Sequence, residues 1–309
     1  MRTTDDLLDE IRGIIAAHAR PDMTTPIAGL LASKVETEAP DYSLTEPLLV
    51  VMAQGGKRIL LGDQVFEYRA GHCLMVTANL PVTGHFLDAS PQVPSLAMAL
   101  VLRPAAVAPL LPELPAGRRP RSAAALPAIA TSEAGADLLD AVARMLRLLD
   151  RPADAPVLAP LIEREILWRL LTGPHGGMIR RIGLADDGLS HVSRAIQWIR
   201  DNYAEPLRIS DLARLAGMSP SAFHRRFRAI TTLSPLQYQK RIRLQEARSL
   251  LVARAGDVVG VAHLVGYDSP SQFNREYRRL FGAPPGQDAA RLRADSAPDS
   301  APDSARHLS

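Results

Sequence analysis

Two similar stretches of seventeen residues lie near the end of the chain, and the second begins fifty residues after the first. Residues 219–235 read SPSAFHRRFRAITTLSP, and residues 269–285 read SPSQFNREYRRLFGAPP. A serine at the N-cap of a helix accepts a hydrogen bond from a free backbone N–H of the first turn, and a proline at the first helical position sacrifices no hydrogen bond. The shared Ser-Pro-Ser start therefore predicts two helices, capped by Ser219 and Ser269.

Each predicted helix has one aromatic side and one polar side. Phe223 and Phe227 are four residues apart in the first copy, as are Phe273 and Tyr277 in the second. Side chains four residues apart lie on the same face of a helix, so we expect each aromatic pair to face a core. The opposite sides carry arginine, histidine, asparagine and glutamine, which suit a polar partner.

A short apolar segment that ends near a glycine precedes each copy. RISDLARLAGM leads to the first and VVGVAHLVGYD to the second, and glycine permits the tight turn between two helices. Helix, glycine turn and polar second helix is the plan of the helix-turn-helix. Residues 234–252 contain no glycine and predict a long helix that joins the two modules. A rigid connector would let both modules reach successive major grooves, about 34 Å apart on one face of B-DNA.

The basic residues are concentrated in the same part of the chain. Residues 190–293 contain seventeen Lys and Arg against eight Asp and Glu, although the net charge of the whole chain is only +3. A basic segment in an otherwise acidic chain indicates a polyanionic partner. The alternative is a solvated basic surface with no such partner.

Residues 190–293 resemble the DNA-binding domain of AraC/XylS-type transcriptional regulators. The resemblance rests on the two modules, and above all on GYDSPSQFNREYRRLFGAPP. It covers a third of the chain. The segment GKRILLGDQVFEYRAGHCLMVTANLPV is similar, less specifically, to the N-terminal sensor domain of one subgroup of these regulators. The resemblance implies a cupin-like domain that binds a small-molecule effector or mediates dimerisation.

The remaining sequence predicts an α+β protein. Short apolar runs between 47 and 103, separated by Gly, Pro, Asn and Asp, indicate the strands of a small β-barrel or sandwich, which the resemblance implies is cupin-like. Helical spacing predicts flanking helices over 5–20, 132–150 and 158–173, the second capped by Ser132. The last two helices complete the core of the β-domain or form a dimer contact, and residues 104–130 form a surface connection.

The predicted domains follow from these changes in pattern. The C-terminal domain is all-α, with two helix-turn-helix modules joined by a long helix. The tail repeats Asp-Ser-Ala-Pro and lacks apolar residues that could anchor it to a core, which is typical of disorder. We expect a sensor or dimerisation domain over 1–182, a linker over 183–189, the DNA-binding domain over 190–293 and a disordered tail over 294–309.

The exposed positions of the two polar faces are the candidates for reading DNA bases. Arginine bonds guanine through two hydrogen bonds, and glutamine and asparagine suit adenine. In similar regulators these positions face base edges. We therefore expect base contacts from Ser221, His224, Arg225, Ser271, Gln272, Asn274 and Arg275.

Other basic residues are better suited to the DNA backbone. Phosphate contacts position a protein on DNA and make its binding salt-dependent, and we assign them to Arg226, Arg228, Lys240, Arg278 and Arg279. Two alternatives stay open for Arg225 and Arg275, which recur in both copies. These arginines could bind phosphates only, or could pair with a carboxylate inside the fold.

The sequence lacks the residues of an enzyme. A metal-dependent cupin needs two histidines one residue apart, and His72 and His85 are isolated. We therefore expect no metal, no cofactor and no catalytic residues. The rival classes are a cupin-type enzyme fused to a DNA-binding module and a DNA-packing protein without sequence preference. Cys73 is the single cysteine, and the apolar residues that follow it favour a buried thiol over a redox sensor.

Composition bears on the predicted location, and the resemblance implies most of the predicted partners. One cysteine allows no intrachain disulfide, and no apolar run approaches the roughly 18 residues that span a bilayer. We expect a cytoplasmic, nucleoid-associated protein that does not bind membranes. Its expected partners are double-stranded promoter or operator DNA and an unknown small-molecule effector. RNA polymerase and a second copy of the chain are further candidate partners.

Overall fold

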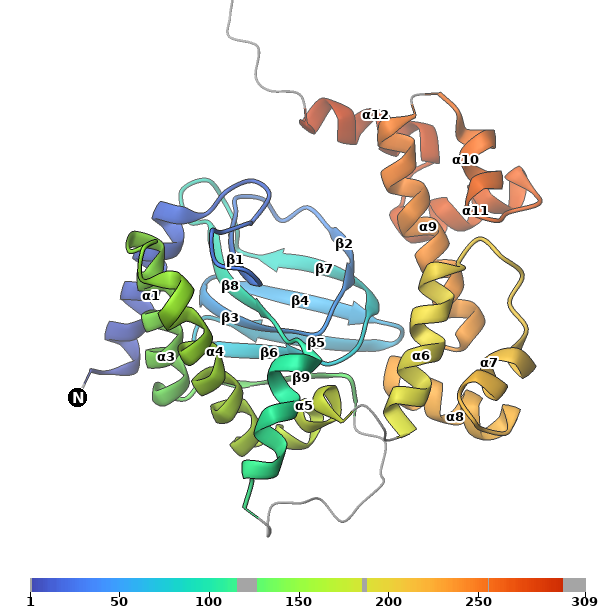
Figure 1. The fold of residues 1–309 in the computed structure, drawn as a ribbon. Helices are drawn as coiled ribbons and strands as arrows, with labels where there is room; N and C mark the ends of the chain where they lie inside the picture. The colour runs from blue at the N-terminus through green and yellow to red at the C-terminus, as the bar shows by residue number, and fades with distance from the viewer. Residues whose placement is uncertain (1, 116–126, 185–187, 255, 297–309) are drawn as a thin grey trace, which may run out of the picture. The chain divides into compact units, whose positions relative to one another are not determined.

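The computed structural model describes residues 2–115, 127–184, 188–254 and 256–296 (Figure 1). By its contacts the chain forms two compact units, Met1–Ile199 with Arg208–Tyr238, and Arg200–Leu207 with Gln239–Ser309. This division differs from the domains that the sequence suggests, because the first helix-turn-helix module falls in the first unit. The sequence-based domain boundaries stay a prediction.

Two antiparallel sheets form the β-sandwich of the first unit. One sheet has the strand order β1-β8-β3-β6-β9 and the other β2-β7-β4-β5. The strands are β1 Leu30–Val35, β2 Asp41–Thr45, β3 Leu48–Gln54, β4 Gly56–Leu61, β5 Gln64–Arg69, β6 His72–Val76, β7 Leu80–Leu87, β8 Ser95–Val101 and β9 Ile129–Glu133. The predicted α+β class with an N-terminal β-sandwich is therefore confirmed.

Helices cover one face of the five-stranded sheet (Figure 1). Successive strand residues point to opposite faces, and in β3 the residues Leu49, Val51 and Ala53 join the core beneath these helices. The helices are α1 Thr4–His18, α2 Pro104–Val107, η1 Ala108–Glu113, α3 Ala136–Arg147, η3 Leu148–Asp150, α4 Ala155–Thr172 and α5 Gly176–Gly183.

The part of the chain that carries the two predicted helix-turn-helix modules is built from helices joined by short turns and loops. Their helices are α6 Gly188–Asp201, α7 Ile209–Leu215, α8 Pro220–Thr231, α9 Pro235–Ala253, α10 Val258–Leu264, α11 Pro270–Phe281 and α12 Pro285–Ser296. The predicted connecting helix is α9. Helix α6 begins inside the predicted linker, and α12 includes the first residues of the predicted tail. The rest of that tail, 297–309, lies outside the described residues.

Two local predictions were wrong. Ser132 does not cap a helix: it lies in β9, and α3 begins after Gly135. Residues 104–130 are not only a surface connection, since α2 and η1 fold there and β9 starts at Ile129. The physical reason is tertiary: β9 forms the outer edge of the sheet by pairing with β6, with Ser132 opposite Cys73, and this pairing overrides the local N-cap signal.

Cys73 is buried as predicted, at 2% exposure. Burial raises the pKa of its thiol, and the Ser132 hydroxyl, 3.4 Å from the sulfur, opposes this shift only in part. In the described ranges no group of three His, Cys, Asp or Glu side chains is placed to hold a metal ion. No helix of these ranges is long and apolar enough to cross a membrane.

Candidate DNA interface

The first helix-turn-helix module consists of α7 and α8. Gly217 adopts a left-handed φ of 60°, and the N–H of Met218 donates to the carbonyl of Ala213 at 2.9 Å, which closes the turn. The Ser219 hydroxyl accepts a hydrogen bond from the N–H of Ala222 at 3.3 Å, so the predicted N-cap is confirmed. The buried ring of Phe223 lies 5.5 Å from that of Phe227 and seats the helix.

The second module repeats this construction in α10 and α11. Gly266 has a φ of 87°, and the N–H of Tyr267 donates to the Ala262 carbonyl at 2.9 Å. The Ser269 hydroxyl accepts a hydrogen bond from the N–H of Gln272 at 3.3 Å. The Phe273 and Tyr277 rings are 5.5 Å apart and buried, as the sequence predicts. The two copies therefore fold alike because they share the cap, the turn and the aromatic pair.

The structure leaves the solvent face of each second helix exposed. All seven predicted base-reading residues are exposed to solvent: Ser221, His224, Arg225, Ser271, Gln272, Asn274 and Arg275. Among the residues described, neither Arg225 nor Arg275 forms an ion pair. The alternative of a carboxylate partner inside the fold thus has no support in the described geometry. Of the predicted phosphate contacts, Arg228, Arg278 and Arg279 are exposed as well.

Two of the predicted DNA contacts are held by a carboxylate. Glu276 accepts hydrogen bonds from Lys240 at 2.8 Å, from the Tyr267 hydroxyl at 2.8 Å and from Gln272 at 3.2 Å. Burial acts to raise the pKa of Glu276, but these three hydrogen bonds outweigh burial and lower it. Lys240 and Gln272 would have to share or leave Glu276 to contact DNA.

The equivalent position of the first module carries the opposite charge. Arg226 occupies in α8 the place that Glu276 occupies in α11, fifty residues later. Arg226 is half-buried, and its Nε atom is buried without a hydrogen-bond partner. The predicted phosphate contact at Arg226 is therefore less accessible than those at the exposed arginines.

A buried aspartate, which the sequence analysis did not predict, holds the buried side of α11. Asp288 accepts hydrogen bonds from Arg248 Nε at 2.8 Å, from the Tyr277 hydroxyl at 2.9 Å and from Arg291 at 2.6 Å. Burial raises the pKa of its carboxyl, but the hydrogen bonds from Arg248 and Tyr277 and the charges of Arg248 and Arg291 together outweigh burial, so the net shift is downward. The sequence did contain a signal for it: Asp288 lies three residues after Pro285, and the equivalent position of the first copy carries Tyr238 and not an acidic residue.

An arginine of α9 organises the turn of the second module. Arg243 donates to the carbonyls of Tyr203 at 2.6 Å, Gly266 at 2.7 Å, Ala204 at 3.1 Å and Glu205 at 3.0 Å. Burial lowers the pKa of this guanidinium. Arg243 was not predicted as a structural residue, because its four partners are backbone atoms that no side-chain pattern reveals.

The β-sandwich region contains two cavities among its described residues. One, of about 260 Å³, has Cys73, Met75 and Leu138 on its apolar wall and Arg169 and His175 among its polar groups. The other, of about 390 Å³, is largely apolar and is lined by Leu100, Met145 and Pro156, among others. Both are lined in part by α4, and the volume of the second falls within the range of roughly 300–1,000 Å³ that is usual for small-molecule sites.

Two helix-turn-helix modules in a chain that also carries an N-terminal β-sandwich are the organisation of a DNA-binding regulator. Comparison with known proteins agrees with this class. Residues 26–178 match the family described as AraC-type transcriptional regulator N-terminus, and residues 212–291 match a helix-turn-helix domain family. The chain belongs to the AraC-type transcriptional regulators. This is a family of regulators and not of enzymes, so the prediction of a non-enzymatic protein is confirmed.

Individual relatives are distant. The transcriptional activator RhaS of Salmonella arizonae is 28% identical over 150 residues, which are 48% of this chain and 52% of RhaS. The chain thus spans about half the length of the curated relatives it matches. Two structures of ToxT from Vibrio cholerae superpose with TM-scores of 0.57 and 0.54, at 8% and 7% identity, over 85% of this chain and 98% of ToxT. At such identity the likeness shows the fold alone.

Proposed function

We propose that the chain is a sequence-specific DNA-binding transcriptional regulator in which α8 and α11 each enter a major groove. The observation that carries the proposal is the repeated construction of the two helices. Each begins at a serine cap, is seated by buried aromatic rings, and exposes a face of arginine and amide or imidazole side chains. Such a face offers hydrogen-bond donors that distinguish base pairs in the major groove.

The two helices are proposed to read different bases. Arg225 and Arg275 occupy the same position in both copies and suit guanine. His224 stands where the second copy has Asn274, and this difference changes the donors and acceptors presented to DNA. A protein that only packed DNA would need cations alone, so the amide and imidazole groups favour a regulator over an architectural protein.

Selection of bound sequences from random DNA with the full chain tests this function. We expect one enriched motif with two half-sites, whose spacing reports the reach of the connecting helix α9. Arg275→Ala is expected to weaken binding to that motif by roughly 1–3 kcal/mol and to relax preference at one base position. Arg279→Ala is the matched control on the same helix: it should weaken all sequences alike and reduce the salt dependence.

Two results would count against the proposal. If specific and random DNA bound with equal affinity, the chain would be a non-specific DNA binder. If Arg275→Ala weakened every sequence uniformly, this arginine would belong with the phosphate contacts, and base reading would have to come from its neighbours.

The N-terminal region is proposed to bind a small-molecule effector that favours one DNA-binding state of the chain over another. The two cavities beside α4 support this role. One ToxT structure contains an unsaturated fatty acid, so unsaturated fatty acids are the first compounds to test. The test is DNA affinity with and without the acid, and an unchanged affinity would remove this effector class. RhaS is an activator. We therefore propose that this chain acts in the cytoplasm and activates transcription by RNA polymerase at a promoter.

A further inference from the structure

The first half of α4 turns two alanines toward the core. Ala155, Ala159 and Glu163 follow one another at steps of four residues, so they lie on one face of the helix. Further along α4 the buried positions carry large side chains, such as Ile166 and Leu170. An alanine methyl leaves unfilled the space that leucine or isoleucine would occupy. This end of α4 therefore leaves open the larger of the two cavities, of about 390 Å³.

The walls of the larger cavity are mainly apolar. Buried core residues of β8 and α3 form its floor, among them Leu100 and Met145, each 1% exposed. Four exposed prolines form its rim: Pro26, Pro152, Pro156 and Pro160. A proline side chain loses almost no conformational entropy when it is covered, so these walls cost little to order around a ligand. Most of the lining therefore suits an apolar ligand body.

One ion pair supplies the charged groups of the larger cavity. The Nη2 atom of Arg103 donates to both carboxylate oxygens of Glu163, at 2.9 Å each. No other described residue that lines the cavity carries a charge, so the lining is neutral overall. The Glu163 side chain is 13% exposed. A carboxylate offers about four lone-pair sites, so Glu163 keeps acceptor sites that Arg103 does not use.

This ion pair selects a ligand by its charge. A ligand hydroxyl can donate to the acceptor sites that remain on Glu163. A ligand carboxylate would instead lie beside the carboxylate of Glu163, and could take Arg103 only by leaving Glu163 without its counter-charge. A ligand amine would pair with Glu163 but would lie beside the guanidinium of Arg103. Because a hydrogen-bonded hydroxyl is cheaper to bury than a charge without its own partner, the lining favours a neutral ligand.

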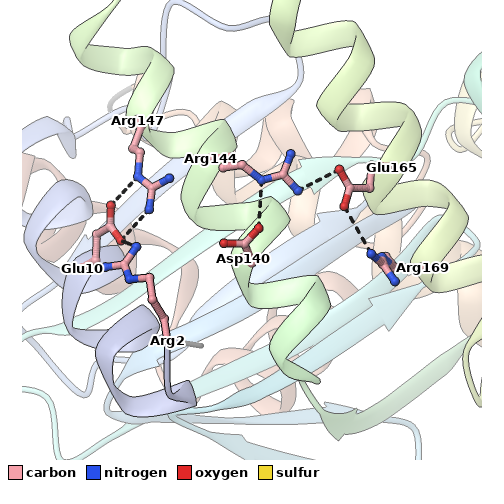
Figure 2. Close-up of polar contacts among 7 residues, drawn as sticks. All are labelled: Arg2, Glu10, Asp140, Arg144, Arg147, Glu165 and Arg169. Carbon is pink, nitrogen blue, oxygen red and sulfur yellow. Dashed lines mark hydrogen bonds and ion pairs between the residues drawn. The ribbon is translucent and has the colours of Figure 1, made fainter.

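Ion pairs outside the larger cavity fix the helices that form its walls, as Figure 2 shows. Arg147 of α3 donates to Glu10 of α1 at 2.9 Å, and Arg144 of α3 donates to Glu165 of α4 at 2.7 Å. Met145, between these two arginines in sequence, lines the cavity, and the four charged residues do not. The helices are thus held together away from the cavity, which limits the rearrangement that ligand binding would require.

We propose that the larger cavity binds a neutral, apolar alcohol or phenol, whose apolar body packs against Leu100 and Met145 and whose hydroxyl donates to Glu163. The proposal rests on the proposed function only in that the bound molecule would be the effector, since binding itself is measured without DNA. It narrows the effector class for this cavity: a fatty acid, with its charged head group, should bind here more weakly than the corresponding alcohol.

Equilibrium dialysis of the full chain with three related compounds tests the proposal. Thymol is a phenol, p-cymene is thymol without its hydroxyl, and p-isopropylbenzoate carries a carboxylate. Thymol is expected to bind at least about tenfold more tightly than either, because a hydrogen bond to a charged group contributes roughly 1.5–3 kcal/mol. Glu163→Gln should reduce the preference for thymol over p-cymene by roughly fivefold. The same variant should raise the affinity for p-isopropylbenzoate, since Arg103 would lose its carboxylate partner.

The location of the site is tested by filling the cavity. Ala159→Leu should weaken thymol binding at least about tenfold, because the larger side chain occupies the space of the ligand. Val157→Leu is the matched control: it places the same side chain on the solvent face of α4, where Val157 is 68% exposed, and should leave binding unchanged. Circular dichroism checks that the variants fold, and the comparison of the three compounds on the wild type needs no variant.

Three results would overturn the proposal: no binding of thymol, equal affinity of the wild type for the three compounds, or thymol binding that a folded Ala159→Leu variant retains in full. Thymol that binds as expected but leaves the affinity for the selected DNA motif unchanged would confirm the ligand site and remove only its effector role. A chain that fails to select a DNA motif would contradict the proposed function and leave the dialysis result as it stands.

Discussion

Asp288→Asn is the substitution that most directly tests how α11 is held. The Asp288 side chain is fully buried and bonds Arg248, Tyr277 and Arg291. Asparagine has nearly the same shape but no charge, so the variant removes the carboxylate without opening a cavity. Arg248, whose side chain is 15% exposed, would then lose the buried negative charge that Asp288 supplies.

Breaking a buried ion pair by removing one partner destabilises a protein by about 3–5 kcal/mol. Because asparagine keeps one acceptor oxygen for Arg248 or Tyr277, we expect the lower end, about 3 kcal/mol. In a domain of 60–100 residues, 1 kcal/mol shifts the Tm by roughly 4–8 °C. The transition that unfolds the second unit should therefore fall by roughly 12–24 °C, which differential scanning calorimetry of the full chain can measure.

The pH dependence provides a second readout. The pKa of Asp288 is lowered in the folded chain, so its carboxylate stabilises the fold fully above the ordinary aspartate value of about 3.9. That contribution is lost as the pH falls through the lower folded value. The wild type should lose stability over this acid range more steeply than Asp288→Asn, and the two proteins should converge in stability at the lowest pH.

Arg291→Met is the control, because Arg291 is 59% exposed and a surface ion pair contributes only about 0–1 kcal/mol. A loss below about 1 kcal/mol in Asp288→Asn at pH 7 would refute the reasoning. A stability difference between Asp288→Asn and the wild type that stayed constant down to pH 2 would refute it equally, since the charge could not then be its source.

Three further predictions concern single positions. Gly266→Ala should destabilise the chain by about 3 kcal/mol, since the added Cβ would stand 2.2 Å from a backbone oxygen at a φ of 87°; chemical denaturation measures this. In Gly282→Ala nothing lies within 4 Å of the added Cβ, so the free energy of unfolding should fall only by the roughly 1–2 kcal/mol that the left-handed conformation costs. Equal losses in Gly266→Ala and Gly282→Ala would contradict the predicted clash at Gly266. Ser269→Ala should lower the free energy of unfolding by about 1 kcal/mol through the lost N-cap, while exposed Ser271→Ala should leave it unchanged. The thiol of Cys73, whose pKa burial raises, should react with a disulfide reagent at pH 8 at least about tenfold more slowly in the folded chain than in denaturant; equal rates would show that it is accessible.

Local signals predicted the helix-turn-helix modules well. The caps at Ser219 and Ser269, the aromatic pairs and the glycine turns each depend on residues within one or two helical turns, so their structure is readable from the chain itself. The strand-rich region between 47 and 103 was likewise recognisable, because Gly, Pro, Asn and Asp separate its short apolar runs. Edge strand β9 was missed, because its pairing partner lies far away in sequence and its Ser132 imitates a helix cap.

Some properties of the candidate DNA-contacting residues were predictable from the sequence and others were not. Their exposure followed from helix periodicity, as for Arg225 and Arg275. The engagement of Lys240 and Gln272 by Glu276 did not, since it requires α9 and α11 to be packed together. The partial burial of Arg226 also depends on its surroundings, although its sequence position equals that of Glu276.

The sequence by itself determined that two alike modules fold from a repeated stretch, because capping, turn geometry and helix periodicity act over a few residues. Only the tertiary structure decided which charged groups are free to meet DNA and which are held. Asp288 and Arg243 gain their roles from burial against distant partners, and burial is a property of the packed chain.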